Sequence, residues 1–398
     1  MRPYSIPSES SGSTANHDSA RESFAEKEGP RYSVEQINCE TEISHLQTDW
    51  NRLSEAAEFP NVFMTYDWYR IWNEQLNQRD NPSQRSPNVL VLKKDGAVTG
   101  ISPLIRRKCS RLGVAARKIE FATIHADYND FVLGDDSISK IEAIVQFLAR
   151  TSDEWDLVDL RDLRINGEIR RRIEDALSRT ELRYLTLPEK DRCPFVQISG
   201  DSAAVTKKLS GHFRKKLRNQ MRRATVEGLR MRIIENPEQE PELLEKLVSL
   251  DHKKHLQRMS PPFIRSNAKV IQSMFDSLGP RGWLYVALIE KGDQPIAFQL
   301  GFRCGKKLWD YAQAYDDDFS RLSPGKLLFA VILDYGFSHG HDEFDFLRGE
   351  DPYKQVWSDG YHWNSQMLIW NSRWSSRAIK FAHHDLLTAI YRMFGRRL

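Results

Sequence analysis

The stretch that decides the fold runs from Leu308 to Trp357 and reads LWDYAQAYDDDFSRLSPGKLLFAVILDYGFSHGHDEFDFLRGEDPYKQVW. Residues 308–315 are rich in aromatic side chains and end in a polar turn, which predicts a strand. Ser-Pro-Gly at 323–325 then has the composition of a helix start, with an N-cap hydroxyl before a proline. Apolar residues continue at helical spacing to Gly340, the predicted helix end.

A short strand follows this helix, because phenylalanines flank Asp345 on both sides. A strand–helix–strand crossover of this length normally makes its two strands parallel. Parallel strands end at the same edge of a sheet, where α/β folds bind ligands. The loop that ends at the Ser323 cap and the loop that holds Arg348, Tyr353 and Lys354 are therefore expected to lie side by side.

This edge is predicted to bind an anion. Amide groups at a helix start favour negative charge, and Gly325 lets a ligand approach the backbone closely. Arg348 and Lys354 would add positive charge at the same place. A phosphate-bearing ligand is the natural candidate, with ordinary helix-start chemistry as the alternative. The residues expected to hold it are Ser323, Pro324, Gly325, Lys326, Arg348 and Tyr315.

Three pieces of this stretch resemble the closing signature of the CelD/BcsL-like acetyltransferases. They are the Pro-Gly helix start at 324–328, the Asp-Phe-Leu-Arg-Gly turn within 344–349, and the Tyr-Lys pair at 353–357. That group belongs to the GNAT superfamily and is related to the FemAB peptidyltransferases. The resemblance extends to residues 209–223 and 295–315, and spans most of 50–370.

The resemblance implies two tandem GNAT-like halves, each with a central mixed sheet flanked by helices. It implies acyl transfer, with acetyl-CoA or another acyl-CoA as donor substrate and no metal. The implied acceptor is an amine or hydroxyl of a sugar or of a cell-envelope polysaccharide precursor. The usual GNAT pyrophosphate loop, an Arg or Gln followed by Gly-x-Gly/Ala, is replaced here by Leu-Ser-Pro-Gly at 322–325.

The bulk composition is that of an ordinary globular protein. Hydrophobic residues make up 40% and charged residues 28% of the chain, and the net charge is only +3. Polyanion binding would therefore have to come from local patches. We find neither a signal peptide nor an apolar run long enough to cross a bilayer. Four widely spaced cysteines favour free thiols in a reducing cytoplasm, so a cytoplasmic location is expected.

The alternation of strands and helices predicts a mixed α/β (α+β) class. A hairpin is expected around Asp95-Gly96, and a meander of three strands between 282 and 315. The C-terminal helix is expected to pack on the first half, with contact to a membrane surface as the alternative. The predicted parts are a disordered tail at 1–30, a first GNAT-like domain at 31–200, a second at 201–370 that carries the donor site, and an amphipathic C-terminal helix at 371–398.

A helix from about Ser202 places apolar residues every four positions and basic residues on its other faces. Charge runs of this kind are usually solvated surfaces. The functional alternative is a lip for a polyphosphate, an anionic lipid-linked sugar or RNA. No aromatic residues alternate with the charges, which disfavours single-stranded nucleic acid. The residues assigned to substrate binding here are Arg214, Lys215 and Arg218.

Acyl transfer needs a base, an oxyanion stabiliser and a held donor. His125 and Asp130 follow a predicted strand end beside Tyr128, and Asp345 lies on a strand, so these three are the candidate bases. Lys354 is the candidate for stabilising negative charge. Tyr128, Tyr353 and Trp357 are expected to contact the acceptor, although aromatic residues at such spacing are more often core.

Two other functions stay open. In one, a FemAB-like enzyme uses aminoacyl-tRNA, with the basic helix near Arg214 contacting the nucleic acid. In the other, the fold is a non-catalytic binding module of a polysaccharide assembly system. A zinc site at His252 and His255 is disfavoured because no carboxylate has the usual spacing, and no motif supports a nucleophilic cysteine.

Overall fold

The strand–helix–strand unit that decides the fold is present in the computed structural model of the protein. β12 (Lys307–Tyr315) leads through a short 3-10 helix to α11 (Pro324–Ser338), and α11 leads to β13 (Glu343–Asp345). β12 and β13 pair in parallel, with Leu308 opposite Phe344. The predicted parallel crossover is therefore confirmed.

The structure describes residues 32–57, 60–79, 84–111, 114–123, 125–164, 168–198, 210–259, 261–349 and 351–381. None of the helices in these ranges has the length and apolar character needed to cross a membrane. The predicted tail at 1–30 and most of the predicted C-terminal helix lie outside the described residues. The predicted domain boundaries stay a prediction.

The first half of the chain alternates strands and helices. Its helices are α1 (Glu40–Ser44), α2 (Gln47–Glu55), α3 (Tyr66–Arg79), α4 (Ser137–Arg150) and α5 (Glu168–Leu177). Its strands are β1 (Ser33–Ile37), β2 (Arg85–Pro87), β3 (Val89–Lys94), β4 (Ala97–Ser102), β5 (Leu104–Arg111), β6 (Val114–Phe121), β7 (Leu157–Arg164) and β8 (Arg183–Gln197). The expected hairpin is β3–β4, whose turn at Asp95-Gly96 has both residues at positive φ.

The second half contains the expected meander. Its strands are β9 (Leu229–Ile234), β10 (Leu284–Lys291), β11 (Gln294–Cys304), β12, β13 and β14 (Gly360–Trp370). Its helices are α7 (Gly211–Val226), α8 (Leu243–Arg258), α9 (Phe263–Ser266), α10 (Ala268–Leu278), α11, α12 (Pro352–Trp357) and α13 (Trp374–Lys380). The meander β10–β11–β12 is antiparallel throughout.

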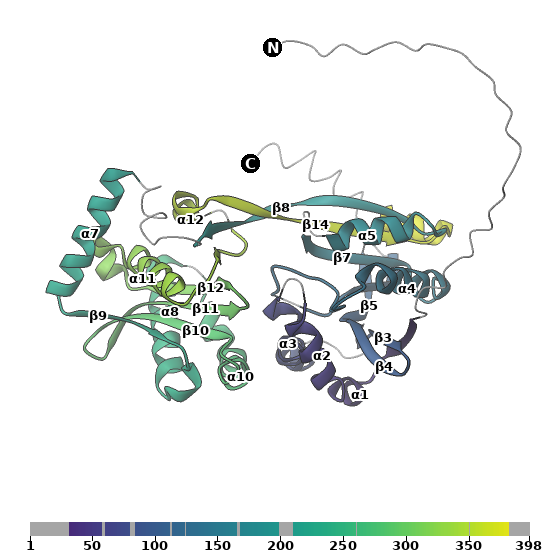
Figure 1. Ribbon diagram of the computed structural model, residues 1–398, viewed down its shortest axis with the longest axis horizontal. Helices are drawn as coiled ribbons and strands as arrows, with labels where there is room; N and C mark the ends of the chain where they lie inside the picture. Colours follow the sequence, from purple (N-terminus) through teal and green to yellow (C-terminus); the bar gives the residue numbers. More distant parts are fainter. Residues whose placement is uncertain are drawn as a thin grey trace, which may run out of the picture. The chain divides into compact units, whose positions relative to one another are not determined.

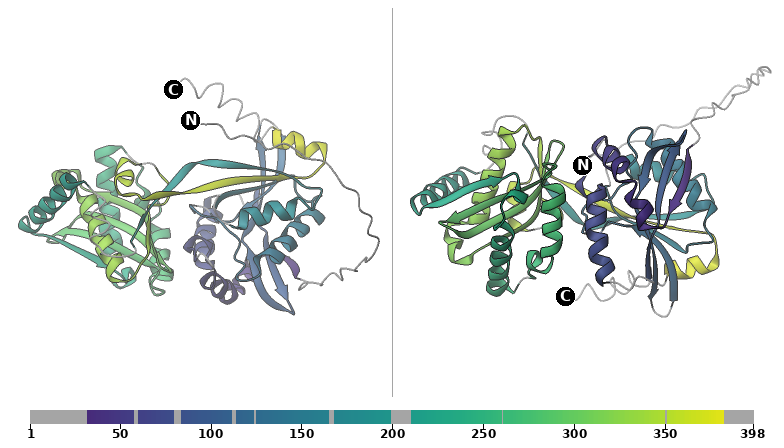
Figure 2. Two further views of the ribbon diagram at one scale, coloured as in Figure 1. Left: turned by 45° about the horizontal axis from the view of Figure 1, so that its top comes forward. Right: turned by 90° about the horizontal axis from the view of Figure 1, so that it is seen from below.

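Eleven strands from both halves form one mixed sheet, flanked by helices (Figure 1). Its order is β2-β5-β6-β7-β14-β8-β13-β12-β11-β10-β9, and β1, β3 and β4 form a separate small sheet. β8 is the strand at the joint, because it pairs with β14 along most of its length and with β13 at its end. Figure 2 shows the long ribbons of β8 and β14 running side by side. β14 also pairs with β7, so a late strand completes the early part of the sheet.

β10 shows why the second half needs helices on both faces of the sheet. Seven of its eight residues are buried in an unbroken run, which is typical of a strand covered on both sides. Leu284, Val286 and Leu288 pack in the cluster that includes α8 and α10. Tyr285, Ala287 and Ile289 pack in the cluster that includes α11. The meander is thereby held rigid beneath the start of α11.

Three local predictions were wrong or incomplete. Ser323 does not cap α11 with its side chain, because its backbone is left-handed at φ 54° and its hydroxyl accepts a 2.8 Å hydrogen bond from Gln220. Tyr353 and Lys354 do not lie in a loop, since they form the first turns of α12. The basic helix, predicted from about Ser202, begins at Gly211, where Ser210 accepts a hydrogen bond from Phe213 N, and residues 202–209 lie outside the described residues.

Candidate functional site

A cavity of about 840 Å³ lies beside β12, and residues of α8, α9, α11 and α12 complete its wall. Gly325 at the start of α11 and Lys354 on α12 both line it, so the two segments expected at one edge do share a pocket. The sequence-predicted residues that line the cavity are His125, Tyr315, Ser323, Gly325, Lys326, Arg348, Tyr353 and Lys354. The helix start and the cationic segment are thus both available to one ligand.

The start of α11 faces the cavity with an accessible amide. Pro324 has no N–H, and the N–H groups of Lys326 and Leu327 bond to the carbonyl of Ser323. The N–H of Gly325 has no acceptor among the described residues. A side chain at Gly325 would meet only Gln313 Oε1, at 3.9 Å, so the space in front of this amide is open. This is the arrangement that binds anions at helix N-termini.

Two lysines in the cavity wall, Lys254 on α8 and Lys326 on α11, have no carboxylate partner among the described residues. Lys254 Nζ donates to the carbonyl of Gln313 at 2.9 Å, and Lys326 Nζ lies 5.1 Å from the ring centre of Phe213. Burial lowers the pKa of both lysines, and the charge of Lys216 adds to the effect on Lys326. Burial makes the charged form of each lysine less stable, and an anion in the cavity would stabilise it again. Both positions therefore favour a negatively charged ligand.

A buried carboxylate forms part of the same wall. Asp310 is on β12, and its Oδ2 accepts a 3.1 Å hydrogen bond from the hydroxyl of Tyr353. Gln313 in turn donates to the Tyr353 hydroxyl. Burial raises the pKa of Asp310 to about 6, against the opposing effects of Lys354 and Tyr353. A carboxylate with a pKa near neutrality, inside a cavity, is suited to accept a proton from a nucleophile.

Lys354 is a buried lysine, with only 6% of its surface exposed. Its Nζ donates to the carbonyls of Phe346 at 2.9 Å and Arg348 at 3.1 Å, and Asp351 Oδ2 lies 3.9 Å away. The ammonium group therefore ties together the segment between β13 and α12. An ammonium group has three protons and two are used by carbonyls, which leaves one for a ligand in the cavity.

Arg348 differs from the two lysines because it is already neutralised. Its guanidinium forms ion pairs with Asp127, at 3.2 Å, and with Asp162. Both carboxylates come from the first half of the chain. Arg348 thus links the two halves at the cavity wall, and a phosphate would have to compete with two carboxylates for it.

The remaining predicted residues in the lining lie at its edges. Tyr315 stacks against the guanidinium of Arg258, 4.2 Å from its ring centre. His125 is exposed, has a left-handed backbone at φ 53° and packs on Trp72 with ring centres 4.3 Å apart. Pro324 is buried at the start of α11 and does not line the cavity. Backbone strain at an exposed histidine in a cavity is a feature of functional sites.

Several predicted site residues lie outside this cavity. Trp357 is 4% exposed and packs between Phe213 and Phe329 in the core. Asp130 borders a separate cavity of about 270 Å³ in the first half. The residues on α7, Arg214, Lys215 and Arg218, belong to neither lining. The structure therefore places Trp357 as a packing residue, buried in the core cluster around α11.

Asp345 and Tyr128 form part of a buried polar cluster behind the cavity. Tyr128 donates a 2.6 Å hydrogen bond to Asp345 Oδ2, and Leu347 N donates to Oδ1 at 2.8 Å. Burial raises the pKa of Asp345 to about 6, although His362 and these hydrogen bonds oppose the shift. Asp345 is completely buried and does not line the cavity. Leu347 lines the cavity, so Asp345 supports the cavity wall through its hydrogen bond with the Leu347 amide.

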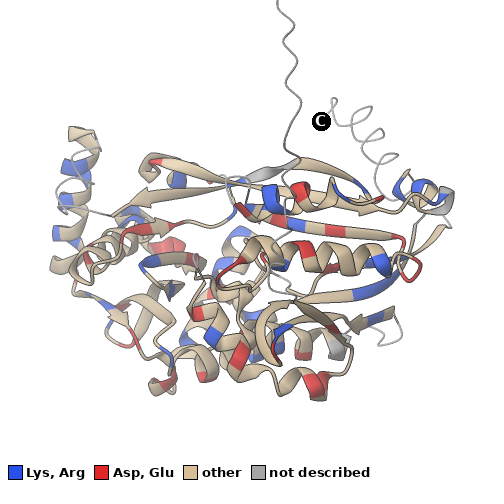
Figure 3. Ribbon diagram, turned by 45° about the vertical axis from the view of Figure 1, so that its right-hand side comes forward, with Lys and Arg blue, Asp and Glu red and all other residues tan. Residues whose placement is uncertain are grey.

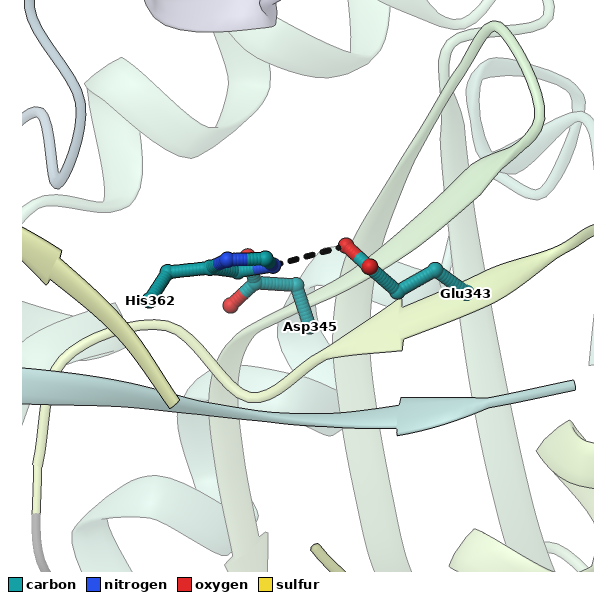
Figure 4. A group of neighbouring side chains, drawn as sticks. All are labelled: Glu343, Asp345 and His362. Atoms are coloured by element: carbon teal, nitrogen blue, oxygen red, sulfur yellow. Dashed lines mark hydrogen bonds and ion pairs between the residues drawn. The ribbon is translucent and has the colours of Figure 1, made fainter. Parts of the chain in front are cut away.

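The same cluster contains a set of potential metal ligands, Glu343, Asp345 and His362, whose ligand atoms lie within 4.8 Å of one another (Figure 4). His362 Nε2 lies 3.0 Å from Glu343 Oε1, and Lys307 Nζ lies 2.7 Å from the same oxygen. A cation at this place would meet the ammonium of Lys307. The donor set therefore fits a hydrogen-bonded network better than a metal centre.

Sequence reasoning missed Asp310, Gln313 and Lys254. Asp310 lies within residues 308–315, whose aromatic side chains predict a strand and give no sign of a functional site. One feature of the sequence does set Asp310 apart. Side chains alternate along β12, so Asp310 lies on the opposite face of the strand from Trp309. Lys254 has no such signal, because α8 reaches the cavity only through the tertiary fold.

The fold and the cavity define a mixed α/β protein with a large cavity, in which positions suited to an anion lie beside a buried carboxylate. Comparison with known families agrees with this class. Residues 211–355, from α7 into α12, match the family model described as an acetyltransferase (GNAT) domain. No curated protein matches this chain.

Solved structures share the fold across nearly the whole chain at low identity. FemX aligns with a TM-score of 0.57 and 11% identity, over 87% of this chain and 98% of FemX. A conserved protein of unknown function from Bacteroides thetaiotaomicron VPI-5482 aligns with a TM-score of 0.54 and 11% identity, over 85% of this chain and all of that chain (100%). These likenesses extend the similarity of fold beyond the segment that the family model matches.

Proposed function

We propose that the protein is an acyltransferase that moves an acyl group, such as acetyl, from acyl-CoA to an amine or hydroxyl of a sugar or cell-envelope precursor. The observation that carries the proposal is that Gly325 and Lys354 line the same cavity. Asp310 lines this cavity as well. The GNAT match at 211–355 supports the reaction class. The finer resemblance to CelD/BcsL-like acetyltransferases supports the acceptor class.

The donor end of the cavity is the start of α11. A phosphate group of the donor would accept hydrogen bonds from the Gly325 amide and from Lys326. Lys254, on helix α8, adds a second, half-buried ammonium group. Phosphate oxygens beside these lysines would stabilise the charged ammonium groups. This offsets the loss of hydration that lowers the pKa values of the two lysines.

The chemical step would take place near Asp310 and Lys354. The acceptor amine or hydroxyl attacks the thioester carbonyl, a carbon–nitrogen or carbon–oxygen bond forms, and the acceptor's proton passes to the Asp310 carboxylate. Negative charge develops on the carbonyl oxygen, where the third proton of Lys354 can stabilise it. The carbon–sulfur bond then breaks and the thiolate leaves. Tyr353 holds Asp310 in place through their hydrogen bond.

The proposal includes a cytoplasmic location. All four cysteines, Cys39, Cys109, Cys193 and Cys304, are free thiols in the structure. Free thiols, two of them buried, support a reducing compartment.

Calorimetry with acetyl-CoA, followed by turnover with a panel of amino sugars, tests the proposal. We expect binding by the natural protein and a loss of binding in Gly325→Val, whose side chain would enter the open space before the amide. Gly325→Ala is the matched control, because an added Cβ has 3.9 Å to its nearest neighbour. Asp310→Asn should bind the donor and fail to turn over. Absence of binding to the natural protein, with no thermal shift, would count against acyl-CoA as donor.

A further inference from the structure

The first half of the chain has a cavity of its own, the first-half cavity, with a volume of about 270 Å³. Its lining includes the segment 129–134, Ser137 at the start of α4, the end of β7 and the first turns of α5. The proposed acyl transfer uses none of these residues. It takes place in the cavity of about 840 Å³ beside β12, the donor cavity, which is about three times larger.

The first-half cavity has the same place in its half as the donor cavity has in the second half. β6 pairs in parallel with β7 after a crossover through α4, as β12 pairs in parallel with β13 after a crossover through α11. The residue before each crossover helix has a left-handed backbone, with φ 45° at Asp136 and φ 54° at Ser323. Each cavity is lined by the start of its crossover helix and by the helix that follows the second strand. Because α/β folds bind ligands at the carboxyl ends of parallel strands, the first half repeats a ligand-binding arrangement.

The start of α4 offers hydrogen-bond donors to this cavity. Gly134 and Ser137 both line it. Among the described residues, the N–H groups of Gly134 and Ser137 and the hydroxyl of Ser137 have no acceptor. Gly134 has a positive φ of 60°, and a Cβ there would have one neighbour within 4 Å, Leu53 Cδ2 at 3.5 Å. Donors of this kind, on an open stretch of backbone at a helix start, favour an anion.

Arginines give the lining an excess of positive charge. Arg164, Arg170 and Arg172 line the cavity, against the two carboxylates of Asp130 and Glu168. Three positive and two negative groups leave one positive charge in excess. Both signs of charge occur along α5, and Figure 3 draws Lys and Arg in blue and Asp and Glu in red along the ribbon.

The arginines of α5 are better placed to bind a ligand than Arg348 is. Arg170 pairs with Glu174 at 2.8 Å, and Arg172 pairs with Glu168, in both cases one turn away on the same helix. Pairs of this kind are weak. A guanidinium also has five N–H donors, more than one carboxylate binds. A ligand oxygen can therefore join or replace these contacts, whereas two carboxylates of the other half hold Arg348.

We infer that the first-half cavity is a second ligand site, for a small organic molecule that carries a phosphate group. The phosphate would accept hydrogen bonds from the start of α4 and from the guanidinium groups of Arg170 and Arg172. The organic part would contact Phe131 and Ile169, two apolar residues of the lining. Ligand pockets usually have volumes of about 300–1,000 Å³, so this molecule is at the small end of the range. The site goes beyond the proposed acyl transfer and does not depend on it.

A crystal soaked in tungstate, a heavy analogue of phosphate, locates the anion sites directly. We expect anomalous density between Ser137 and the arginines of α5, and a second peak at Gly325 in the donor cavity. Density at Gly325 alone would overturn the inference and leave the proposed function standing. Density in the first half alone would support the inference and count against the proposed donor site.

Binding of inorganic phosphate in solution, followed by phosphorus NMR line broadening, tests the same site without a crystal. The Gly325→Val protein is used so that the donor cavity is blocked, and saturable binding of phosphate should remain. Adding Arg170→Gln and Arg172→Gln should weaken this binding at least about tenfold, because two guanidinium groups are lost. Absence of saturable binding in Gly325→Val would overturn the inference and make the crystal density that of an adventitious ion only.

The matched control removes the same charge from exposed positions outside the lining. It adds Arg171→Gln on α5 and Arg183→Gln on β8 to the same Gly325→Val protein. Phosphate binding should be unchanged in this control. Equal weakening in the two sets of variants would overturn the inference, because the effect would then be one of overall charge. Thermal melts of every variant establish that the binding constants compare folded proteins.

Discussion

Tyr128 and Asp345 are 217 residues apart in the chain, and the hydroxyl of one donates a 2.6 Å hydrogen bond to the carboxylate of the other inside the protein. Asp345 also accepts from the amide of Leu347, whose left-handed backbone places its side chain in the cavity wall. The hydrogen bond from Tyr128 in the first half to Asp345 in the second half therefore supports the part of the cavity wall that Leu347 forms.

Replacing Tyr128 with Phe should destabilise the protein by about 1–3 kcal/mol, because the buried carboxylate loses a donor. Chemical denaturation measures this change. Tyr311→Phe is the control, since the buried Tyr311 hydroxyl has no hydrogen-bond partner among the described residues. A Tyr128→Phe protein as stable as the natural one would contradict the role given to this hydrogen bond.

The pH dependence of turnover should report Asp310. Burial raises its pKa to about 6, and the base must be ionised to accept a proton. Activity is therefore expected to be low below pH 6 and to rise through about pH 6 as pH increases. The measurement is kcat/KM between pH 5 and pH 8. The residual turnover of Asp310→Asn should lack this limb, whereas Asp276→Asn, at an exposed position on α10, should preserve it. An unchanged limb in Asp310→Asn would assign it to another group.

Lys354→Met should lower kcat by about 10²-fold or more, since loss of an oxyanion donor has effects of this size. Stability should fall as well, because the carbonyls of Phe346 and Arg348 lose their donor. Measuring kcat and the melting temperature of the same variant separates the two effects. If kcat is retained while the melting temperature falls, Lys354 acts only in holding the segment.

The proposal that Trp357 is a packing residue makes a different prediction. Trp357→Ala should cost about 3–5 kcal/mol of stability, as expected for removing a large buried aromatic side chain. Trp357→Phe should keep most of the stability and leave KM for the acceptor unaltered. A large rise in KM in the Phe variant at full stability would return Trp357 to the acceptor site.

Glu343 should contribute to stability in a pH-dependent way. Burial alone would raise its pKa, but hydrogen bonds from His362 and Lys307 prevail and lower it to about 2. Because the folded pKa is below the unfolded value of about 4.5, the contribution is complete above about pH 5 and is lost as pH falls toward 2. Glu343→Gln should therefore cost about 3 kcal/mol at pH 7. The difference from the natural protein should shrink by pH 4, and a constant difference would contradict this assignment.

The sequence was sufficient for what depends on neighbours along the chain. The aromatic run of β12, the Pro-Gly start of α11 and the Asp-Gly turn of the β3–β4 hairpin are local signals, and each element is present. The parallel pairing of β12 with β13 followed from the length of the crossover. This is why Gly325 and Lys354 could be expected at one edge.

What the sequence did not show depends on contacts between distant residues. Burial in the tertiary fold raises the pKa of Asp310, and its hydrogen-bond partner Tyr353 comes from α12, 43 residues later. Arg348 has the composition of a phosphate ligand, yet Asp127 and Asp162 from the first half neutralise it. The sequence around Asp310 does not predict its contact with Tyr353. The sequence around Arg348 does not predict its ion pairs with the two aspartates.

The position of β13 in the sheet limits how the protein can be divided. Its two neighbours are β12 and β8, and β8 in turn pairs with β14. A fragment trimmed to residues 211–355 would lack both β8 and β14, and would expose one side of β13 as an unpaired edge. Open strand edges recruit other chains, so such a fragment is expected to aggregate even though it holds the whole GNAT match. β8 and β14, outside the match, thereby cover a strand edge of the second half that would otherwise be free to pair with another chain.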